Sequence, residues 1–218
     1  ESQSENLENN AQAAPAKKST AAKSKTTASV INVELEKIRD LNIGDKVRTR
    51  GIVSVEPGVL GTQFFYLAGS VAGSGVQVYS YKKDFPNLKV GQTIEVTGEL
   101  SESGGERRIK TATRNDIKIL DSSAKIIEPH QISLAEAGEE YEGSLVKVQS
   151  EVIEVKGSSI YLDDGSDEAT VYLKQSAGIK GLGLKQGDRV SVIGIVSQTK
   201  SGYRILPRYQ SDIEIIKG

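Results

Sequence analysis

The sequence predicts an all-β protein that consists of two similar domains behind a polar N-terminal segment. From Val30 onward, short β-branched runs alternate with polar residues and are separated by Gly, Asn, Asp and Pro, which is typical of short strands. These runs form two sets of five in the same order. The first 29 residues are almost entirely Ala, Ser, Thr, Lys, Asn, Gln and Glu, and such a segment cannot bury enough apolar area to fold.

The composition excludes several classes of site. The 218 residues include 28 basic and 29 acidic side chains, one His, and no Cys, Met or Trp. Without Cys there is no disulfide, thiolate zinc site or cysteine nucleophile, and one His leaves a histidine triad without partners. No apolar stretch approaches the roughly 18 residues of a membrane span. The near-zero net charge argues against a polycationic nucleic-acid binder but allows a local basic groove.

We expect three segments, namely a disordered linker at 1–29 and two domains at 30–121 and 122–218. The stretch DKVRTRGIVSVEPG aligns with SLVKVQSEVIEVKG, and LKVGQTIEVTGELSESGGERRI aligns with LKQGDRVSVIGIVSQTKSGYRI. Each copy is long enough to close its own core, so the repeat indicates a duplicated domain rather than a solenoid. Because the chain begins with Glu1 and not Met, we expect it to be processed or to be part of a longer protein.

Each copy supplies five strands. The first set comprises Lys46–Val55, Gln63–Ala68, Gly75–Tyr81, Thr93–Leu100 and Arg107–Leu120. The second set comprises Leu145–Val155, Ser158–Asp163, Ala169–Lys174, Arg189–Val196 and Tyr203–Ile216. Between the third and fourth runs of the first copy, KKDFPNLKVGQ contains a proline and predicts a crossover of helical or irregular character.

This order of elements is that of the OB-fold, a five-stranded Greek-key barrel. A long first strand is followed by two shorter strands, a crossover, and two strands joined by a hairpin. Ligands of such barrels usually bind the outer face of strands 2 and 3, between the loops that join strands 1–2 and 4–5. Those loops read EPGVLGTQ, SESGGE and QTKSG here, and their glycines are also what ordinary hairpin turns require.

Side-chain alternation predicts which residues lie on that outer face. We expect the inward residues to be Phe65, Leu67, Val76, Val78, Ile160, Leu162, Val171 and Leu173. The outward residues include Phe64, Gln77 and Tyr81, together with two pairs of matching tyrosines, Tyr66 with Tyr161 and Tyr79 with Tyr172. Exposed tyrosines could form a base-stacking platform. The alternative is that they serve cross-strand packing or are buried against a neighbouring domain.

Basic residues cluster near the same face. In the first copy these are Arg48, Arg50, Lys82, Lys83, Arg107, Arg108, Lys110 and Arg114, and in the second they are Lys174, Lys200, Arg204 and Arg208. Residues 31–121 hold 13 basic and 12 acidic side chains, whereas residues 122–218 hold 11 and 14, so the first copy is the better candidate for phosphate contact. Interspersed charges of both signs are also the ordinary surface of a soluble domain.

Other chemistries are less well supported. The acidic cluster Asp163, Asp164, Asp167 and Glu168 lacks the spacing of a calcium loop and is better explained as an Asp-Gly turn. Three further carboxylates, Glu139, Glu140 and Glu142, fit a short helix or turn before the second barrel. His130 follows a proline in the linker and is expected to be a surface residue. The glycines of KGLGLKQGD lack the remaining residues of a phosphate loop.

The chain resembles OB-fold modules appended to secreted bacterial nucleases and lamin-tail-type cell-surface proteins. The resemblance rests on GDKVRTRGIVSVEPGVLGTQFFYLAG, GVQVYSYKKDFPNLKVGQTIEVTGEL, YEGSLVKVQSEVIEVKGSSIYLDDG and PRYQSDIEII, and it covers residues 31–218. It implies nucleic-acid binding through Tyr66, Tyr79, Tyr161 and Tyr172, and an extracellular, cell-surface or periplasmic location.

We therefore predict a noncatalytic module that binds nucleic acid, preferably single-stranded DNA, without a cofactor or metal ion. The alternatives are a structural or interaction module that binds a cell-surface protein or glycan, and an accessory domain of a secreted nuclease. The predicted contact residues are Arg48, Arg50, Phe64, Tyr66, Tyr79, Tyr81, Arg107, Arg108, Lys110, Tyr161, Tyr172, Lys174, Arg204 and Arg208.

Overall fold

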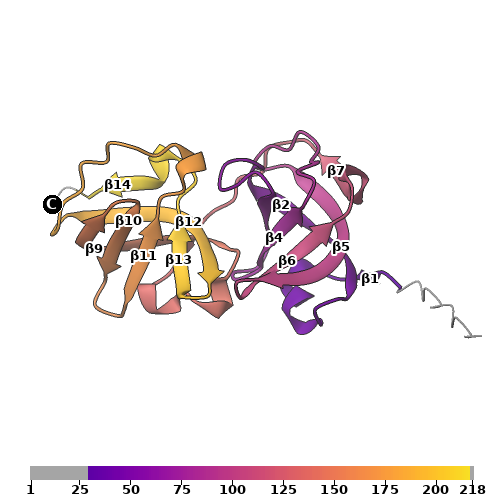
Figure 1. The fold of residues 1–218 in the computed structure, drawn as a ribbon, viewed down its shortest axis with the longest axis horizontal. Helices are drawn as coiled ribbons and strands as arrows, with labels where there is room; N and C mark the ends of the chain where they lie inside the picture. Colours follow the sequence, from indigo (N-terminus) through magenta and orange to yellow (C-terminus); the bar gives the residue numbers. More distant parts are fainter. Residues whose placement is uncertain (1–28, 217–218) are drawn as a thin grey trace, which may run out of the picture.

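The computed structural model describes residues 29–216, which form two five-stranded barrels, one after the other along the chain (Figure 1). Of the disordered linker predicted at 1–29, all but the last residue lies outside the described residues. Within the described range, no helix is long and apolar enough to cross a membrane.

Five strands close the first barrel. They are β2 (Lys46–Val55), β3 (Phe64–Ala68), β4 (Gly75–Ser80), β5 (Thr93–Ser103) and β6 (Glu106–Thr111). β2 pairs with both β3 and β5, β3 pairs with β4, and β5 pairs with β6, all antiparallel. β4 and β6 run parallel and complete the circle. This pairing is that of the OB-fold and confirms the predicted architecture.

The second barrel repeats this pairing. Its strands are β9 (Leu145–Lys156), β10 (Ser159–Asp163), β11 (Glu168–Tyr172), β12 (Arg189–Thr199) and β13 (Gly202–Leu206). β9 pairs with β10 and β12, β11 pairs with β10, and β13 joins β12 antiparallel and β11 parallel. The duplication that is visible in the sequence is therefore a duplication of the whole barrel.

The last run of each copy is not one strand, as the sequence pattern predicted, but two. An aspartate breaks it in both copies: Asp116 Oδ2 accepts the backbone N–H of Thr113 at 2.8 Å, and Asp212 Oδ2 accepts that of Arg208 at 2.8 Å. A carboxylate that binds N–H groups of the preceding residues favours a short turn over a continuous strand. The resulting elements are η2 (Arg114–Asp116), β7 (Ile117–Asp121), η6 (Gln210–Asp212) and β14 (Ile213–Ile215), with η denoting a 3-10 helix.

Short elements precede each barrel, and the sequence pattern did not predict most of them. They are β1 (Ile31–Asn32), η1 (Leu35–Asp40), β8 (His130–Gln131), η3 (Leu134–Glu136) and η4 (Glu139–Tyr141), and η5 (Gln175–Ala177) follows β11. β1 and β8 run parallel to β2 and β9. The short helix expected around Glu139 is present as η4.

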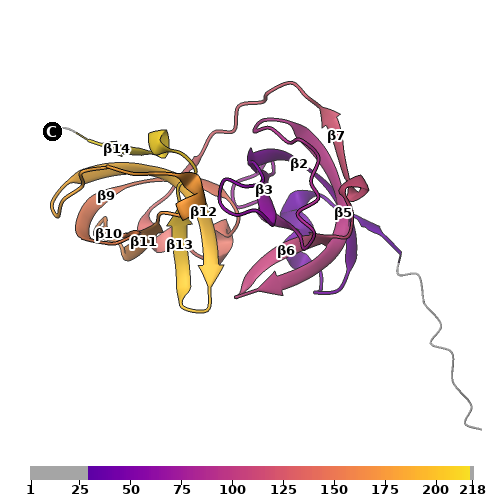
Figure 2. The same ribbon diagram turned by 45° about the horizontal axis from the view of Figure 1, so that its top comes forward.

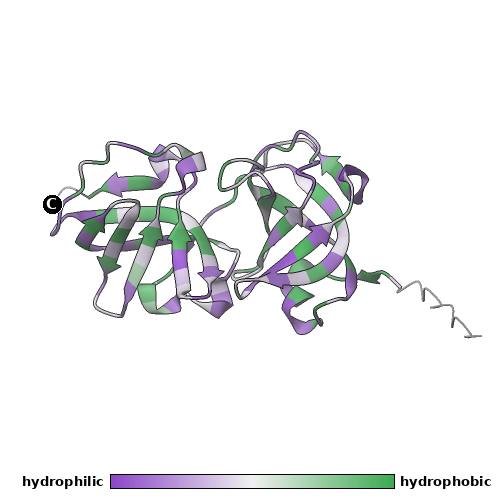
Figure 3. Cartoon of the chain, in the orientation of Figure 1, coloured by the Kyte–Doolittle hydropathy of each residue, from purple (hydrophilic) through white to green (hydrophobic). Residues whose placement is uncertain are grey.

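The predicted alternation holds along the strands. Phe65, Leu67, Val76 and Val78 are buried in the first core, and Ile160, Leu162 and Val171 are buried in the second, with Leu173 packed against it. Hydrophobic and hydrophilic residues accordingly alternate along the ribbons (Figure 3).

A third apolar cluster lies between the two barrels and joins them. Val55, Leu60 and Tyr66 of the first barrel pack there against Leu145, Ile195 and Leu206 of the second. The chain after β7 passes over to the second barrel (Figure 2). β12 and β13 lie on the side of the second barrel that faces β4 and β6 of the first (Figure 1).

Polar contacts add to this apolar junction. The Gly75 N–H donates to Ser144 Oγ at 2.9 Å, and Arg208 Nη1 donates to the Ser54 carbonyl at 3.0 Å. Contacts of both kinds hold the two barrels in one arrangement.

Candidate nucleic-acid interface

A groove runs between the two barrels where the outer face of β3, β4 and β6 meets β12 and β13. Its volume is about 340 Å³, at the lower end of the range for small-molecule sites. We call it the interbarrel groove and define it by the residues that line it, which are Gln63, Phe64, Tyr66, Gln77, Tyr79, Ser103, Gly104, Glu106, Arg108, Lys174, Ser197, Gln198, Thr199, Lys200, Arg204 and Leu206. These residues include four cations and one carboxyl group.

The same arginine-on-tyrosine arrangement occurs once in each barrel. The Arg108 guanidinium lies over the Tyr79 ring at 4.0 Å from its centroid, and the Arg204 guanidinium lies over the Tyr172 ring at 4.8 Å. In both barrels the tyrosine is on the third strand and the arginine is on the parallel fifth strand beside it. The duplication has thus produced two equivalent cation–π pairs, whose arginines both line the interbarrel groove.

This arrangement changes the predicted role of the two tyrosines. One face of each ring is covered by a guanidinium, so neither ring is a bare platform. A guanidinium plane can itself stack on a base while its N–H groups donate to phosphate. The unit that is available to a ligand is therefore the arginine–tyrosine pair.

Tyr66 was predicted to be an exposed stacking residue, and that prediction is wrong. Its side chain points out of the first barrel, as alternation requires, but the second barrel covers it and its exposed fraction is 0%. Its hydroxyl donates to Glu106 Oε1 at 2.7 Å and accepts from Gln77 Nε2 at 3.0 Å. Burial raises the pKa of Tyr66 well above its usual value.

Glu106 forms the floor of the groove and connects the barrels. Besides the bond from Tyr66, it accepts a hydrogen bond from Ser197 of the second barrel, with 2.9 Å between Oγ and Oε2. Burial raises the pKa of Glu106, although these two hydrogen bonds lower it.

Two cations of the second barrel lie close together in the groove. Burial lowers the pKa of Lys174, and the neighbouring Arg204 lowers it further. The Arg204 Nε is buried and has no hydrogen-bond partner among the described residues. Two like charges that are held near each other favour the approach of an anion.

The remaining predicted residues lie partly in the groove and partly elsewhere. Phe64 is half-buried and packs beside Tyr66, with 5.8 Å between the ring centroids. Lys110 is exposed on β6, where it is the strand partner of Tyr79, so it lies on the same outer face of the barrel as Tyr79. Tyr81 is 76% exposed at the end of the third run. Tyr161 is half-buried on β10 and does not line the interbarrel groove.

Four predicted arginines have other partners. Arg50 Nη2 pairs with Glu95 at 3.1 Å, and Arg48 lies near the same carboxylate on the β2–β5 face. Arg107 Nη1 donates to three carbonyl groups of η1 and the residue after it, including that of Ile38 at 2.9 Å. Arg208 is paired with Asp212 at 3.0 Å. None of these four side chains lines the interbarrel groove, because each is on another face or is held by a partner of its own.

Several groove residues were absent from the predicted set, among them Glu106, Gln77, Ser197 and Gln198. With its amide oriented to suit its neighbours, Gln198 donates to the Gly105 carbonyl at 2.7 Å and to Glu142 Oε2 at 3.0 Å. Alternation placed Gln77 on the outer face, but the other three have no distinguishing pattern in the sequence, since each is important only where the second barrel meets the first.

The acidic cluster between β10 and β11 forms a turn, as predicted. Asp163 Oδ1 accepts the Gly165 N–H at 2.7 Å, and Asp164 Oδ2 accepts the Leu134 N–H at 2.8 Å. Within residues 29–216, no group of three or more His, Asp or Glu side chains could hold a metal ion.

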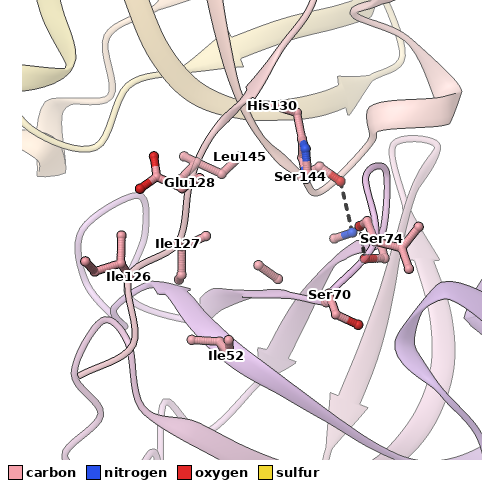
Figure 4. A pocket seen from close by; sticks show the side chains of 13 residues that line it. Ile52, Ser70, Ser74, Ile126, Ile127, Glu128, His130, Ser144 and Leu145 are labelled. Atoms are coloured by element: carbon pink, nitrogen blue, oxygen red, sulfur yellow. Dashed lines mark hydrogen bonds between the residues drawn. The ribbon is translucent and has the colours of Figure 1, made fainter. Parts of the chain in front are cut away.

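A second cavity between the barrels lies beneath the linker (Figure 4). It measures about 290 Å³, and Ile52, Ile127 and Leu145 border it together with Glu128 and His130. It contains neither of the arginine–tyrosine pairs, so it is a weaker candidate for binding nucleic acid.

No family model and no curated protein matches the sequence. Similar solved structures include an OB domain of MM0293 from Methanosarcina mazei, which is 17% identical and has a TM-score of 0.35 over 42% of this chain and 88% of that chain. The telomere capping protein Ten1 from Saccharomyces pombe is 14% identical, with a TM-score of 0.33 over 42% of this chain and 84% of that chain. An OBody, AM1L10, bound to hen egg-white lysozyme is 23% identical, with a TM-score of 0.34 over 43% and 98%.

Proposed function

We propose that this protein binds nucleic acid in the interbarrel groove, with a preference for single strands and without catalysing a reaction. The observation that carries the proposal is the repeated arginine–tyrosine pair, once per barrel, with both arginines lining one groove. Base stacking and phosphate contact need aromatic or guanidinium planes next to cations, and each pair supplies both.

The charge of the groove supports a polyanionic ligand. Arg108, Lys174, Lys200 and Arg204 line it with Glu106 as the only carboxylate, although the whole chain has a formal net charge of −1. The groove therefore carries a local excess of positive charge. An anion that approaches it is attracted more strongly than the net charge of the whole chain would predict.

A single strand fits this surface better than a duplex. A duplex keeps its base faces stacked, whereas a single strand can place unstacked bases against the arginine–tyrosine pairs. Oligonucleotides also have repeating phosphates that can reach cations on both barrels.

We also propose that the chain functions outside the cytoplasm as a binding module, as its resemblance to modules of secreted nucleases and cell-surface proteins implies. Fractionation of the source cells, with immunodetection of the native protein, tests this location. Recovery in the cytoplasmic fraction alone would contradict it.

The binding experiment is fluorescence anisotropy with labelled single- and double-stranded DNA of equal length at two salt concentrations. We expect saturable binding of the single strand that weakens as salt rises, with a slope of about −0.7 per phosphate contacted. Replacing Tyr79 with Ala removes the ring that supports the Arg108 guanidinium, and it should weaken binding by about 1–3 kcal/mol, the usual contribution of one stacked base. Arg108→Ala and Arg204→Ala should weaken binding and reduce the salt slope.

Arg50→Ala is the matched control, because it removes the same charge from another face of the first barrel. If the native protein binds no DNA at low salt, the proposal is wrong. If Arg50→Ala weakens binding as much as Arg108→Ala, DNA binds elsewhere and the interbarrel groove is not the site.

A further inference from the structure

The second barrel contains a larger, more apolar cavity at one end. It measures about 490 Å³, a volume typical of small-molecule sites, and lies between the β9–β10 hairpin and the chain at 178–184. Ile160, Leu173 and Leu182 form part of its wall, and Val155, which is 44% exposed, lies at its edge.

In the first barrel, aromatic rings fill the equivalent position. There Phe65 and Phe85 pack edge to face with 5.4 Å between their centroids, and Leu88 is buried at 3% exposure. In the aligned second copy, Ile160 stands where the first copy has Phe65, and the crossover from 173 to 187 contains no aromatic residue. Loss of two rings from a close-packed position leaves volume that smaller side chains cannot fill.

The crossover chain is less deeply buried over the cavity than its counterpart in the first barrel. Leu184, which aligns with Leu88, is only partly buried. Gly181 and Gly183 have φ values of +63° and +65°, and a Cβ added to either would meet no atom within 4 Å. Neither glycine therefore has a neighbour on the side to which a side chain would point.

The charged residues that line the cavity are both basic. Lys174 and Lys180 line it, and no Asp or Glu does. An apolar wall with Lys180 at its exposed side and no carboxylate is complementary to a ligand that combines an apolar body with a negative charge.

We propose that this cavity binds a small amphiphilic carboxylate, with its alkyl chain against the apolar wall and its carboxylate near Lys180. The cavity is distinct from the interbarrel groove, although Lys174 lines both.

The test is isothermal titration calorimetry of the whole chain with octanoate, octan-1-ol and octylammonium, which share one alkyl length and differ in charge. Octanoate should bind with the highest affinity and octylammonium with the lowest. Lys180→Glu should weaken octanoate binding by at least about fivefold, which corresponds to roughly 1 kcal/mol for a partly exposed charge pair. Val155→Trp should obstruct the cavity and abolish binding.

Lys185→Glu is the matched control, because it makes the same charge change on the same crossover at an exposed residue that does not line the cavity. Circular dichroism establishes that each variant is folded, and Lys180→Glu decides the outcome if Val155→Trp does not fold. The proposal is wrong if octanoate does not bind saturably, or if Lys180→Glu and Lys185→Glu have equal effects.

Discussion

Replacing Tyr66 with Phe separates a structural role of this residue from a ligand-binding one. The substitution keeps the buried ring and removes only the hydroxyl that donates to Glu106 at 2.7 Å. A hydrogen bond to a charged group contributes about 1.5–3 kcal/mol, and here its loss leaves a buried carboxylate with one donor fewer. For a protein of this size, the melting temperature should therefore fall by roughly 3–12 °C.

The loss should depend on pH. The Tyr66 hydrogen bond lowers the pKa of Glu106, so removing it raises that pKa further. The bond stabilises the ionised carboxylate, and its contribution is therefore fully present above the pKa of Glu106 in the folded protein and decreases as that group is protonated. The destabilisation by Tyr66→Phe should be smaller at pH 5 than at pH 8.

Urea denaturation of the native and Tyr66→Phe proteins at both pH values measures the loss of stability. Fluorescence anisotropy with single-stranded DNA measures the DNA affinity of the two proteins. We expect a loss of stability with unchanged DNA affinity in the folded protein. Unchanged stability, or a loss of DNA affinity like that of Tyr79→Ala, would refute the assignment of Tyr66 to the junction between the barrels.

Two further predictions concern the junction. Burial raises the pKa of Glu142 to about 7, well above the value of about 4.3 in an unfolded chain. Between these two pH values the folded state binds more protons than the unfolded state, so the free energy of unfolding falls as pH rises. The total fall is at most about 3–4 kcal/mol. Glu142→Gln should flatten the fall in urea stability from pH 5 to pH 8, and an unchanged pH dependence would exclude Glu142 as its source. Gly75→Ala should destabilise the protein by about 1–3 kcal/mol or more, because a Cβ there would overlap the backbone of Gly143. Gly44→Ala is the comparison for backbone strain alone. Its Cβ would meet no atom within 4 Å, but the φ of +97° at this position strains any side chain. A Gly75→Ala protein as stable as the native one in thermal unfolding would show that the barrels do not approach so closely.

The strand order was predictable because it depends on local signals that recur. Alternation along Gln63–Ala68 and Gly75–Tyr81 identified the inward residues, and the second copy repeated the pattern, so both barrels followed from the sequence. The interruption of each fifth run was not predicted, because a single aspartate, Asp116 or Asp212, ends the strand by accepting backbone N–H groups.

The candidate site was predicted only in part. Alternation distinguishes the inside of a barrel from its outside, but it does not show whether the outside faces water or another domain. Tyr66 and Tyr161 are equivalent in sequence, yet the second barrel buries the first of them and leaves the second partly exposed. Arg107 and Arg108 are adjacent, but one is held by carbonyl groups at the end of η1 while the other lies on Tyr79 in the groove.

The sequence by itself determined that this protein has two OB-fold barrels and that each has a tyrosine on its third strand and an arginine on its fifth, because strand periodicity and duplication are encoded residue by residue. Only the tertiary structure decided that the two arginine–tyrosine pairs adjoin one groove and that Glu106 and the buried Tyr66 line it where the barrels meet. The physical reason is that these contacts connect residues of two separately folded barrels, whose relative placement depends on how their surfaces fit together and not on any local pattern.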